Sequence, residues 1–193
     1  MKILLIFFFL FNSQLLFAED ISDFQIEGIS IGDSLLNYMT KQEIQNEIDD
    51  TKDMYSHLSD KFAAIASVTG SMTISTYDNC SPSHPTPILQ IHGLLDFVVP
   101  YNGNSGSKSI SDVMSYWSNY SSCNSEPDTL IKYDNYALIR YETYVNCLND
   151  VNIKLILHPT MDHTWPNINS HNISASNEIW DFVSQYNLYG FIN

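Results

Sequence analysis

Two short segments of this chain carry residue types that together suit acid–base chemistry. Residues 92–101 read His-Gly-Leu-Leu-Asp-Phe-Val-Val-Pro-Tyr and contain Asp96, and residues 162–166 read Asp-His-Thr-Trp-Pro and contain His163. Each segment follows a short apolar run that predicts a strand, at residues 87–91 and 153–157. An acid and then a histidine, each on a loop after a buried strand, is the order found in the second half of a Ser…Asp…His hydrolase site.

The elements that must hold these loops alternate between strand and helix. Apolar runs at residues 62–68, 88–91 and 153–157 predict buried strands, and apolar positions at helical spacing predict helices at residues 110–120 and 175–186. In the first helix the apolar face consists of Ile110, Val113, Met114 and Trp117. Strands that alternate with helices are typical of an α/β fold with a mostly parallel sheet.

The residue pattern before residue 58 differs from that of the rest of the chain. Residues 1–18 have a positive Lys2, an apolar run and Ala18 before two acids, which predicts a secretory signal peptide. Residues 19–57 form a segment to which we assign no role, with a short strand and turn expected at 24–32 and a helix at 40–58. The hydrolase-like part spans residues 58–193. We therefore expect an extracellular or periplasmic protein with no stable membrane insertion after signal removal.

The composition and net charge argue against some classes of partner. Apolar residues make up 44% of the chain and charged residues only 16%, so a folded domain is expected rather than a disordered one. The formal net charge is −14. Because nucleic-acid binding needs clustered Lys and Arg, this charge argues against a nucleic-acid partner.

The three cysteines fit an exported protein. Cys123 and Cys147 flank a tyrosine-rich stretch that has the pattern of a hairpin, and exported chains oxidise such pairs, so we expect a disulfide between them. Cys80 is then left without a partner in this chain. No metal-binding spacing of cysteine or histidine is present, and we expect no metal and no cofactor.

Several of these segments resemble one family. Residues 62–72 (Phe-Ala-Ala-Ile-Ala-Ser-Val-Thr-Gly-Ser-Met), 92–103, 163–166 and 177–182 (Asn-Glu-Ile-Trp-Asp-Phe) resemble the exported α/β-hydrolases of the polyhydroxybutyrate depolymerase and feruloyl or acetylxylan esterase type. The resemblance covers residues 58–193 and implies a partial α/β-hydrolase fold. It also implies a disulfide at Cys123 and Cys147. One departure is that Thr160, Met161 and Asp162 precede the histidine, where the family has glycines.

The resemblance implies a serine carboxylic-ester hydrolase acting on a polyester or a plant cell-wall ester. Carried over by position, Asp96 is the triad acid and His163 the general base, which would take the serine proton and return it to the leaving alkoxide. Tyr101 and Trp165 are candidates for lining the substrate pocket or, equally, for packing at the loop base. Of the other histidines, His92 is expected to bond locally, and His57, His84, His158 and His171 to lie on the surface or in loops.

The nucleophile is the missing member. The family places a Gly-x-Ser-x-Gly turn about twenty residues before the strand at Phe62, and the strained backbone of that turn needs small residues. Residues 41–47 have neither serine nor glycine, so we predict that the elbow is lacking and the chain inactive or weakly active.

Three alternatives follow from that prediction. Gly32-Asp33-Ser34-Leu35 spells the motif of the GDSL esterases and offers Ser34 as a substitute nucleophile, although the adjacent Asp162 and His163 lack the spacing of that family. Ser71 follows the wrong strand for a nucleophile. The chain is otherwise a non-catalytic exported binding or remnant protein, with self-association through an exposed sheet edge as one consequence.

Overall fold

The computed structural model describes residues 25–26, 29–30, 62–134 and 137–192. The chain divides into two compact units, Met1–Asn46 and Glu47–Asn193. In the first unit, strands β1 (Gln25–Ile26) and β2 (Ile29–Ser30) pair antiparallel, which is the form taken by the predicted strand and turn. Several predictions fall outside the described residues: the signal peptide at 1–18, the helix at 40–58, the boundary at 57/58, and those for Ser34 and His57.

The second unit contains a five-stranded sheet. Its strands are β3 (Ile65–Val68), β4 (Ile88–Gly93), β5 (Asp128–Asp134), β6 (Ala137–Tyr144) and β7 (Ile153–His158), in the spatial order β3-β4-β7-β6-β5. The pairs β3–β4 and β4–β7 are parallel, whereas β6 runs antiparallel to both of its neighbours. The α/β class with a mostly parallel sheet is thus confirmed, and β6 is the one reversed strand among those described.

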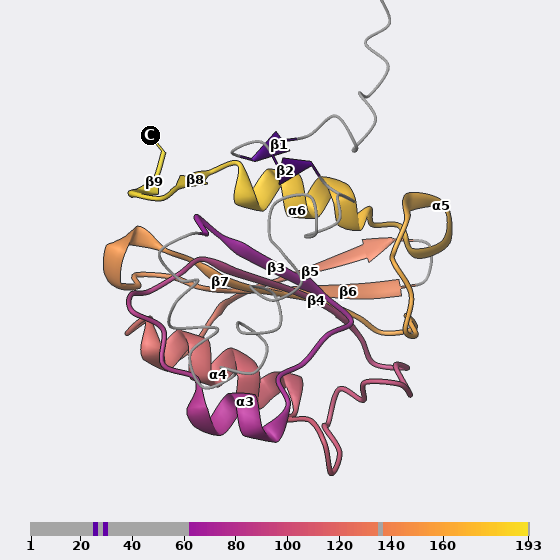
Figure 1. The fold of residues 1–193 in the computed structure, drawn as a ribbon. Helices are drawn as coiled ribbons and strands as arrows, with labels where there is room; N and C mark the ends of the chain where they lie inside the picture. Colours follow the sequence, from indigo (N-terminus) through magenta and orange to yellow (C-terminus); the bar gives the residue numbers. More distant parts are fainter. Residues whose placement is uncertain (1–24, 27–28, 31–61, 135–136, 193) are drawn as a thin grey trace, which may run out of the picture. The chain divides into compact units, whose positions relative to one another are not determined.

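Helices lie on both faces of this sheet (Figure 1). Helix α6 (Ala175–Val183) covers one face, and α3 (Ile74–Asn79) and α4 (Ile110–Tyr120) lie on the other. Because both faces are covered, side chains of β7 must be apolar on both sides of the sheet. Ile153, Leu155 and Leu157 join the core under α4, and Ile156 joins the core under α6. The predicted face of α4 is buried as expected: Ile110, Val113, Met114 and Trp117.

The register of β4 and β7 matters most for function. Gly93 pairs with His158 at the last step of the parallel ladder, so both strands end at the same level. The loop after each strand therefore starts beside the other. In open α/β sheets this carboxyl end is where ligand sites form.

Some sequence predictions differ from the structure. The sequence predicted no helix between the strands at 62–68 and 88–91, but α3 occupies residues 74–79, where Thr73 caps it by accepting the Thr76 N–H at 3.1 Å. The first strand of the hydrolase-like part begins at Ile65, not at residue 62. Helix α6 ends at Val183 rather than 186, and Tyr186 belongs to β8 (Tyr186–Asn187), which pairs with β9 (Gly190–Phe191).

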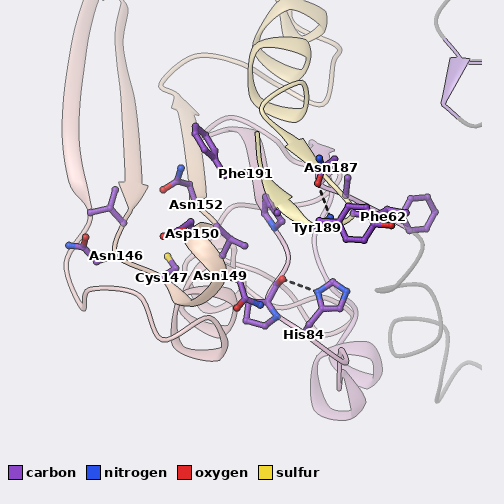
Figure 2. Close-up of a pocket in the computed structure, with 17 residues that line it drawn as sticks. Phe62, His84, Asn146, Cys147, Asn149, Asp150, Asn152, Asn187, Tyr189 and Phe191 are labelled. Atoms are coloured by element: carbon purple, nitrogen blue, oxygen red, sulfur yellow. Dashed lines mark hydrogen bonds between the residues drawn. The ribbon is translucent and has the colours of Figure 1, made fainter. Parts of the chain in front are cut away.

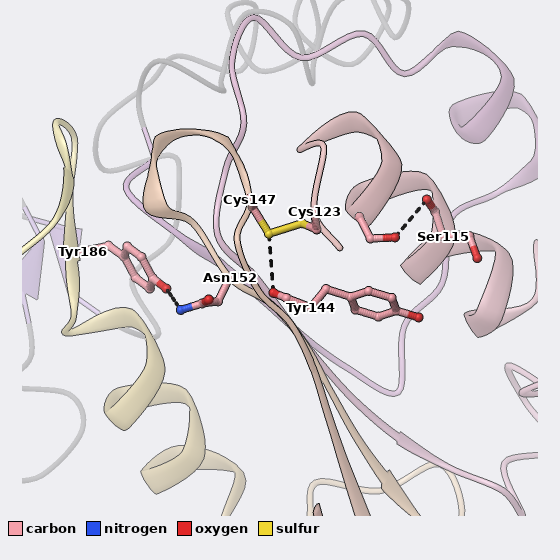
Figure 3. Close-up of a disulfide and its surroundings, with 7 residues drawn as sticks. Ser115, Cys123, Tyr144, Cys147, Asn152 and Tyr186 are labelled. Carbon is pink, nitrogen blue, oxygen red and sulfur yellow. Dashed lines mark hydrogen bonds between the residues drawn. A yellow bond between two sulfur atoms is a disulfide. The ribbon is translucent and has the colours of Figure 1, made fainter. Parts of the chain in front are cut away.

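The predicted hairpin and its disulfide are confirmed. β5 and β6 pair antiparallel between the two cysteines, and Cys123 and Cys147 are joined by a disulfide (Figure 3). The bridge ties the end of α4 to the loop that leads into β7, and the Leu148 N–H donates to the Ser121 carbonyl at 2.8 Å beside it. Cys80 is a free, half-buried thiol. A disulfide indicates folding in an oxidising compartment, in agreement with export.

Candidate functional site

Two loops at the carboxyl end of the sheet are joined by backbone hydrogen bonds. The Leu94 N–H donates to the His158 carbonyl at 3.0 Å, and the Leu95 N–H donates to the Met161 carbonyl at 3.1 Å. Met161 is fully buried in the core under α6. The histidine loop is therefore fixed by a core side chain.

Asp96 is held in one orientation by its own loop. Its Oδ1 accepts the N–H groups of Val98 and Val99 at 2.9 and 2.8 Å, and its side chain is fully buried. Burial raises the pKa of Asp96, but the Val99 N–H, the His163 ring and the Val98 N–H stabilise the anion, and the pKa is lowered on balance. The carboxylate is therefore ionised at neutral pH and has Oδ2 left for a further donor.

His163 is that donor. Its Nδ1 lies 2.9 Å from Asp96 Oδ2, and 39% of its side chain is exposed. Because an ionised carboxylate only accepts, Nδ1 carries the proton and Nε2 is left as an acceptor. A buried carboxylate that orients a partly exposed imidazole in this tautomer is the arrangement a general base needs.

His92 supports the acid loop and lies outside this pair. Its Nε2 donates to the Val99 carbonyl at 2.9 Å, while its distance to Asp96 Oδ2 is 3.7 Å, too long for a hydrogen bond. Gln90 Nε2, 3.4 Å from His92 Nδ1, is the donor that fixes this tautomer. Burial lowers the pKa of His92, so the ring is neutral and structural, as the prediction of local bonding requires.

The prediction that His158 lies on the surface or in a loop is wrong. His158 ends β7, is 2% exposed, and accepts the Thr160 N–H at Nδ1, which leaves Nε2–H to donate to the His171 carbonyl at 3.0 Å. The sequence signal for this burial was its position directly after the apolar run 153–157. His158 thus fixes the start of the histidine loop. The other two described histidines with the same prediction, His84 and His171, are half-buried.

The two candidate pocket residues have different environments. Tyr101 packs against the core under α4, 6.4 Å from the His92 ring between centroids, whereas Trp165 is 55% exposed two residues after His163. Tyr101 thus has the packing role, and Trp165 stays a candidate for substrate contact. The two loops also expose a set of large apolar side chains around the pair: Leu94, Leu95, Phe97, Val98 and Ile168.

Within residues 62–134 and 137–192, no serine is found hydrogen-bonded to His163. Ser71, weighed from the sequence, donates its hydroxyl to the Lys108 carbonyl at 2.7 Å after the end of β3. Among the residues that the structure describes, no group of three or more His, Cys, Asp or Glu residues is arranged to hold a metal ion. None of the described helices is long and apolar enough to cross a membrane.

One motif escaped the sequence reasoning. Residues 28–32 read Gly-Ile-Ser-Ile-Gly, which has the Gly-x-Ser-x-Gly spacing, so the prediction that the chain lacks this motif is wrong. The motif, with Ser30 at its centre, lies farther before Phe62 than the twenty or so residues that the resemblance implies. Ser30 is the last residue of β2, in the first unit, and its candidacy rests on the motif alone.

No protein-family model matches this chain, and no curated protein matches it. The family resemblance therefore stays a prediction drawn from the motifs, and the chemistry of the site has to be argued from its geometry.

Proposed function

We propose that this chain is a secreted carboxylic-ester hydrolase of the polyhydroxybutyrate depolymerase and feruloyl esterase type, with a partial α/β-hydrolase fold. One observation carries the proposal: a buried, ionised Asp96 orients the exposed His163 at the carboxyl ends of adjacent parallel strands. Asp96 Oδ2 and His163 Nδ1 lie 2.9 Å apart. An imidazole held in a single tautomer by a buried carboxylate, with 39% of its side chain exposed, suits acid–base catalysis.

In this proposal the nucleophile is a serine hydroxyl, for which Gly-x-Ser-x-Gly at residues 28–32 and Gly-Asp-Ser-Leu at residues 32–35 are the sequence candidates. His163 Nε2 removes the proton from the serine hydroxyl as the oxygen attacks the ester carbonyl, and the imidazolium then protonates the leaving alkoxide. Water repeats the sequence on the acyl-enzyme and restores the serine. Asp96 stabilises the imidazolium throughout and stays ionised.

The apolar side chains around the pair support an ester with a bulky apolar acyl or aromatic group. Phe97 is 85% exposed and Trp165 55% exposed, one on each site loop. Exposed apolar clusters of this kind mark interaction surfaces. A polyester chain or a feruloyl group presents the matching apolar surface.

The test is reaction with a fluorophosphonate probe and with p-nitrophenyl butyrate. We expect a burst of nitrophenol, probe attached at a serine, and loss of both in His163→Ala, with His171→Gln as the control that keeps both. Probe attached at Ser30 would favour the Gly-x-Ser-x-Gly motif. Probe attached at Ser34 would instead favour a GDSL-type esterase. Absence of both burst and labelling would contradict an active hydrolase and leave a remnant site.

A non-catalytic exported binding protein is the second candidate, and the sheet edges favour it. In the described sheet β3 and β5 are the outer strands, and the β5–β6 hairpin exposes several large apolar side chains: Leu130, Ile131, Tyr133 and Leu138. Exposed edge strands with apolar side chains recruit further strands. Light scattering that gives a dimer mass, lost in Ile131→Lys, is expected if self-association is the function.

A further inference from the structure

A hollow of about 880 Å³ lies at the opposite end of the sheet from Asp96 and His163 (Figure 2). Its walls come from the segments that enter β3, β4 and β7 and from the turn between β8 and β9. Since β4 has six residues, its two ends are about 20 Å apart. The hollow is therefore separate from the candidate ester site.

The lining has a distinctive chemistry. Among the described residues, the lining contains four asparagines, at positions 146, 149, 152 and 187, together with the rings of Phe62, Tyr189 and Phe191, and no lysine or arginine. The titratable groups in this described lining, other than Tyr189, are His84 and Asp150. In the view of Figure 2 the labelled amides of the β6–β7 loop lie on the left, and the rings of Phe62 and Tyr189 on the right.

The amides on the loop side are available to a ligand. The side chains of Asn146 and Asn149 make no hydrogen bond to any other residue in the described part of the chain, whereas Asn152 Nδ2 donates to the Tyr186 hydroxyl at 3.0 Å and keeps its carbonyl oxygen. Each amide offers both donors and an acceptor. Such groups suit neutral hydroxyls, which donate and accept in the same way.

The loop that carries these amides is pre-organised. Asn146, Asn149 and Asp150 adopt left-handed backbone conformations, with φ of 55°, 59° and 53°. Such conformations cost energy for residues other than glycine and concentrate at ligand sites. The disulfide of Cys147 and the hydrogen bond from Leu148 to Ser121 hold the loop in place.

The facing turn presents an aromatic ring to solvent. Tyr189 is 99% exposed, and the turn is fixed because Asn187 Oδ1 accepts the Tyr189 N–H at 2.8 Å and Gly190 takes a positive φ of 116°. Phe62 and Phe191 are 47% and 43% exposed beside it. Aromatic faces exposed next to amides bind the C–H faces of sugar rings while the amides bind the hydroxyls.

We propose that this hollow, formed by the β6–β7 loop and the β8–β9 turn, binds a neutral saccharide chain. Asp150 in the lining disfavours anionic ligands, since a carboxylate or phosphate would face its negative charge, and the described lining residues include no lysine or arginine to offset it. The hollow would anchor the protein to a polysaccharide, and this role holds whether or not the ester site is active.

Titration calorimetry of the full chain with cellohexaose, xylohexaose and mannohexaose tests the proposal, with hexagalacturonate as the anionic comparison. We expect at least one neutral hexaose to bind more tightly than hexagalacturonate. Tyr189→Ala should weaken that binding about fivefold or more. Asn149→Gly, which removes the amide and keeps the left-handed backbone, should weaken it as well.

Tyr133→Ala is the matched control, because Tyr133 is an exposed tyrosine on β5 outside the hollow. It should bind like the unmodified chain. No binding to any neutral hexaose, stronger binding to hexagalacturonate, or binding unchanged in both Tyr189→Ala and Asn149→Gly would overturn the proposal. Ester hydrolysis by Tyr189→Ala should be unchanged, so failure here is distinguishable from failure of the ester site.

Discussion

Gly93 and the backbone of Met161 are in such close contact that no side chain fits between them. A Cβ atom on Gly93 would lie 1.9 Å from the Met161 carbonyl oxygen and 2.5 Å from its carbonyl carbon. Gly93 begins the acid loop and Met161 lies in the histidine loop, so this contact sets the distance between the loops that carry Asp96 and His163.

Gly93→Ala should therefore separate the two loops. Because the contact is with backbone, which cannot rotate away, we expect the free energy of unfolding in urea to fall by about 2–3 kcal/mol. Gly106→Ala is the control, since the nearest atom to its Cβ is Asn104 Oδ1 at 3.5 Å, and it should change stability by no more than about 0.5 kcal/mol. Equal stability of the two variants would contradict the close packing of the loops.

Asp96→Asn tests the electrostatic half of the pair. An asparagine can still accept the Val98 and Val99 N–H groups, but its NH₂ would donate to His163 Nδ1 and move the imidazole proton to Nε2. If the proposed ester chemistry is present, hydrolysis should fall by about 10²–10⁴-fold. The free energy of unfolding should fall by about 1.5–3 kcal/mol because a buried charged hydrogen bond is lost.

Asp162→Asn is the matched control, because Asp162 is the exposed carboxylate next to His163. It should leave both rate and stability close to those of the unmodified chain. A rate in Asp96→Asn equal to that in Asp162→Asn would show that Asp96 does not act through His163.

The sequence was most informative where apolar spacing is strong. The face of α4 and the runs that became β4 and β7 follow the helical and buried-strand patterns, so these elements were predictable within a residue or two. Helix α3 was missed because it buries no residue and is stabilised by the Thr73 cap, which apolar periodicity cannot show.

The meeting of Asp96 with His163 was anticipated from motifs, but its cause was not. Their contact depends on the register that pairs Gly93 with His158, and strand register is a tertiary property. The burial of Met161 was not visible from the sequence, because this residue lies in a loop. The aromatic and amide lining of the hollow comes from three separate segments, and only the fold unites them.

Acid should destabilise the chain through two buried histidines. Burial lowers the pKa of His92 and of His158 below the ordinary 6.5, so between that value and the folded pKa the unfolded chain binds protons that the folded chain does not. Stability should be full above about pH 7 and fall as pH drops through 6.5, by at most about 1.4 kcal/mol per pH unit for each histidine.

The lowered pKa of Asp96 adds to this loss at lower pH, below the ordinary 3.8, as the unfolded carboxyl protonates first. Urea unfolding at pH 7.5, 6.5 and 5.5 measures the slope. His158→Gln should reduce it, since one titrating group is gone. A slope identical to that of the unmodified chain would contradict the neutral, buried state of His158.

The disulfide should contribute a large part of the stability of the second unit. Cys123 and Cys147 are separated by 24 residues, and a loop of that length implies about 3 kcal/mol from the restricted unfolded chain. The double variant Cys123→Ser with Cys147→Ser should lose this amount in urea unfolding. Cys80→Ser is the control, because Cys80 is a free thiol, and it should lose much less. Thiol titration of the denatured, unreduced chain should detect Cys80 alone, and detection of all three cysteines would contradict the bridge.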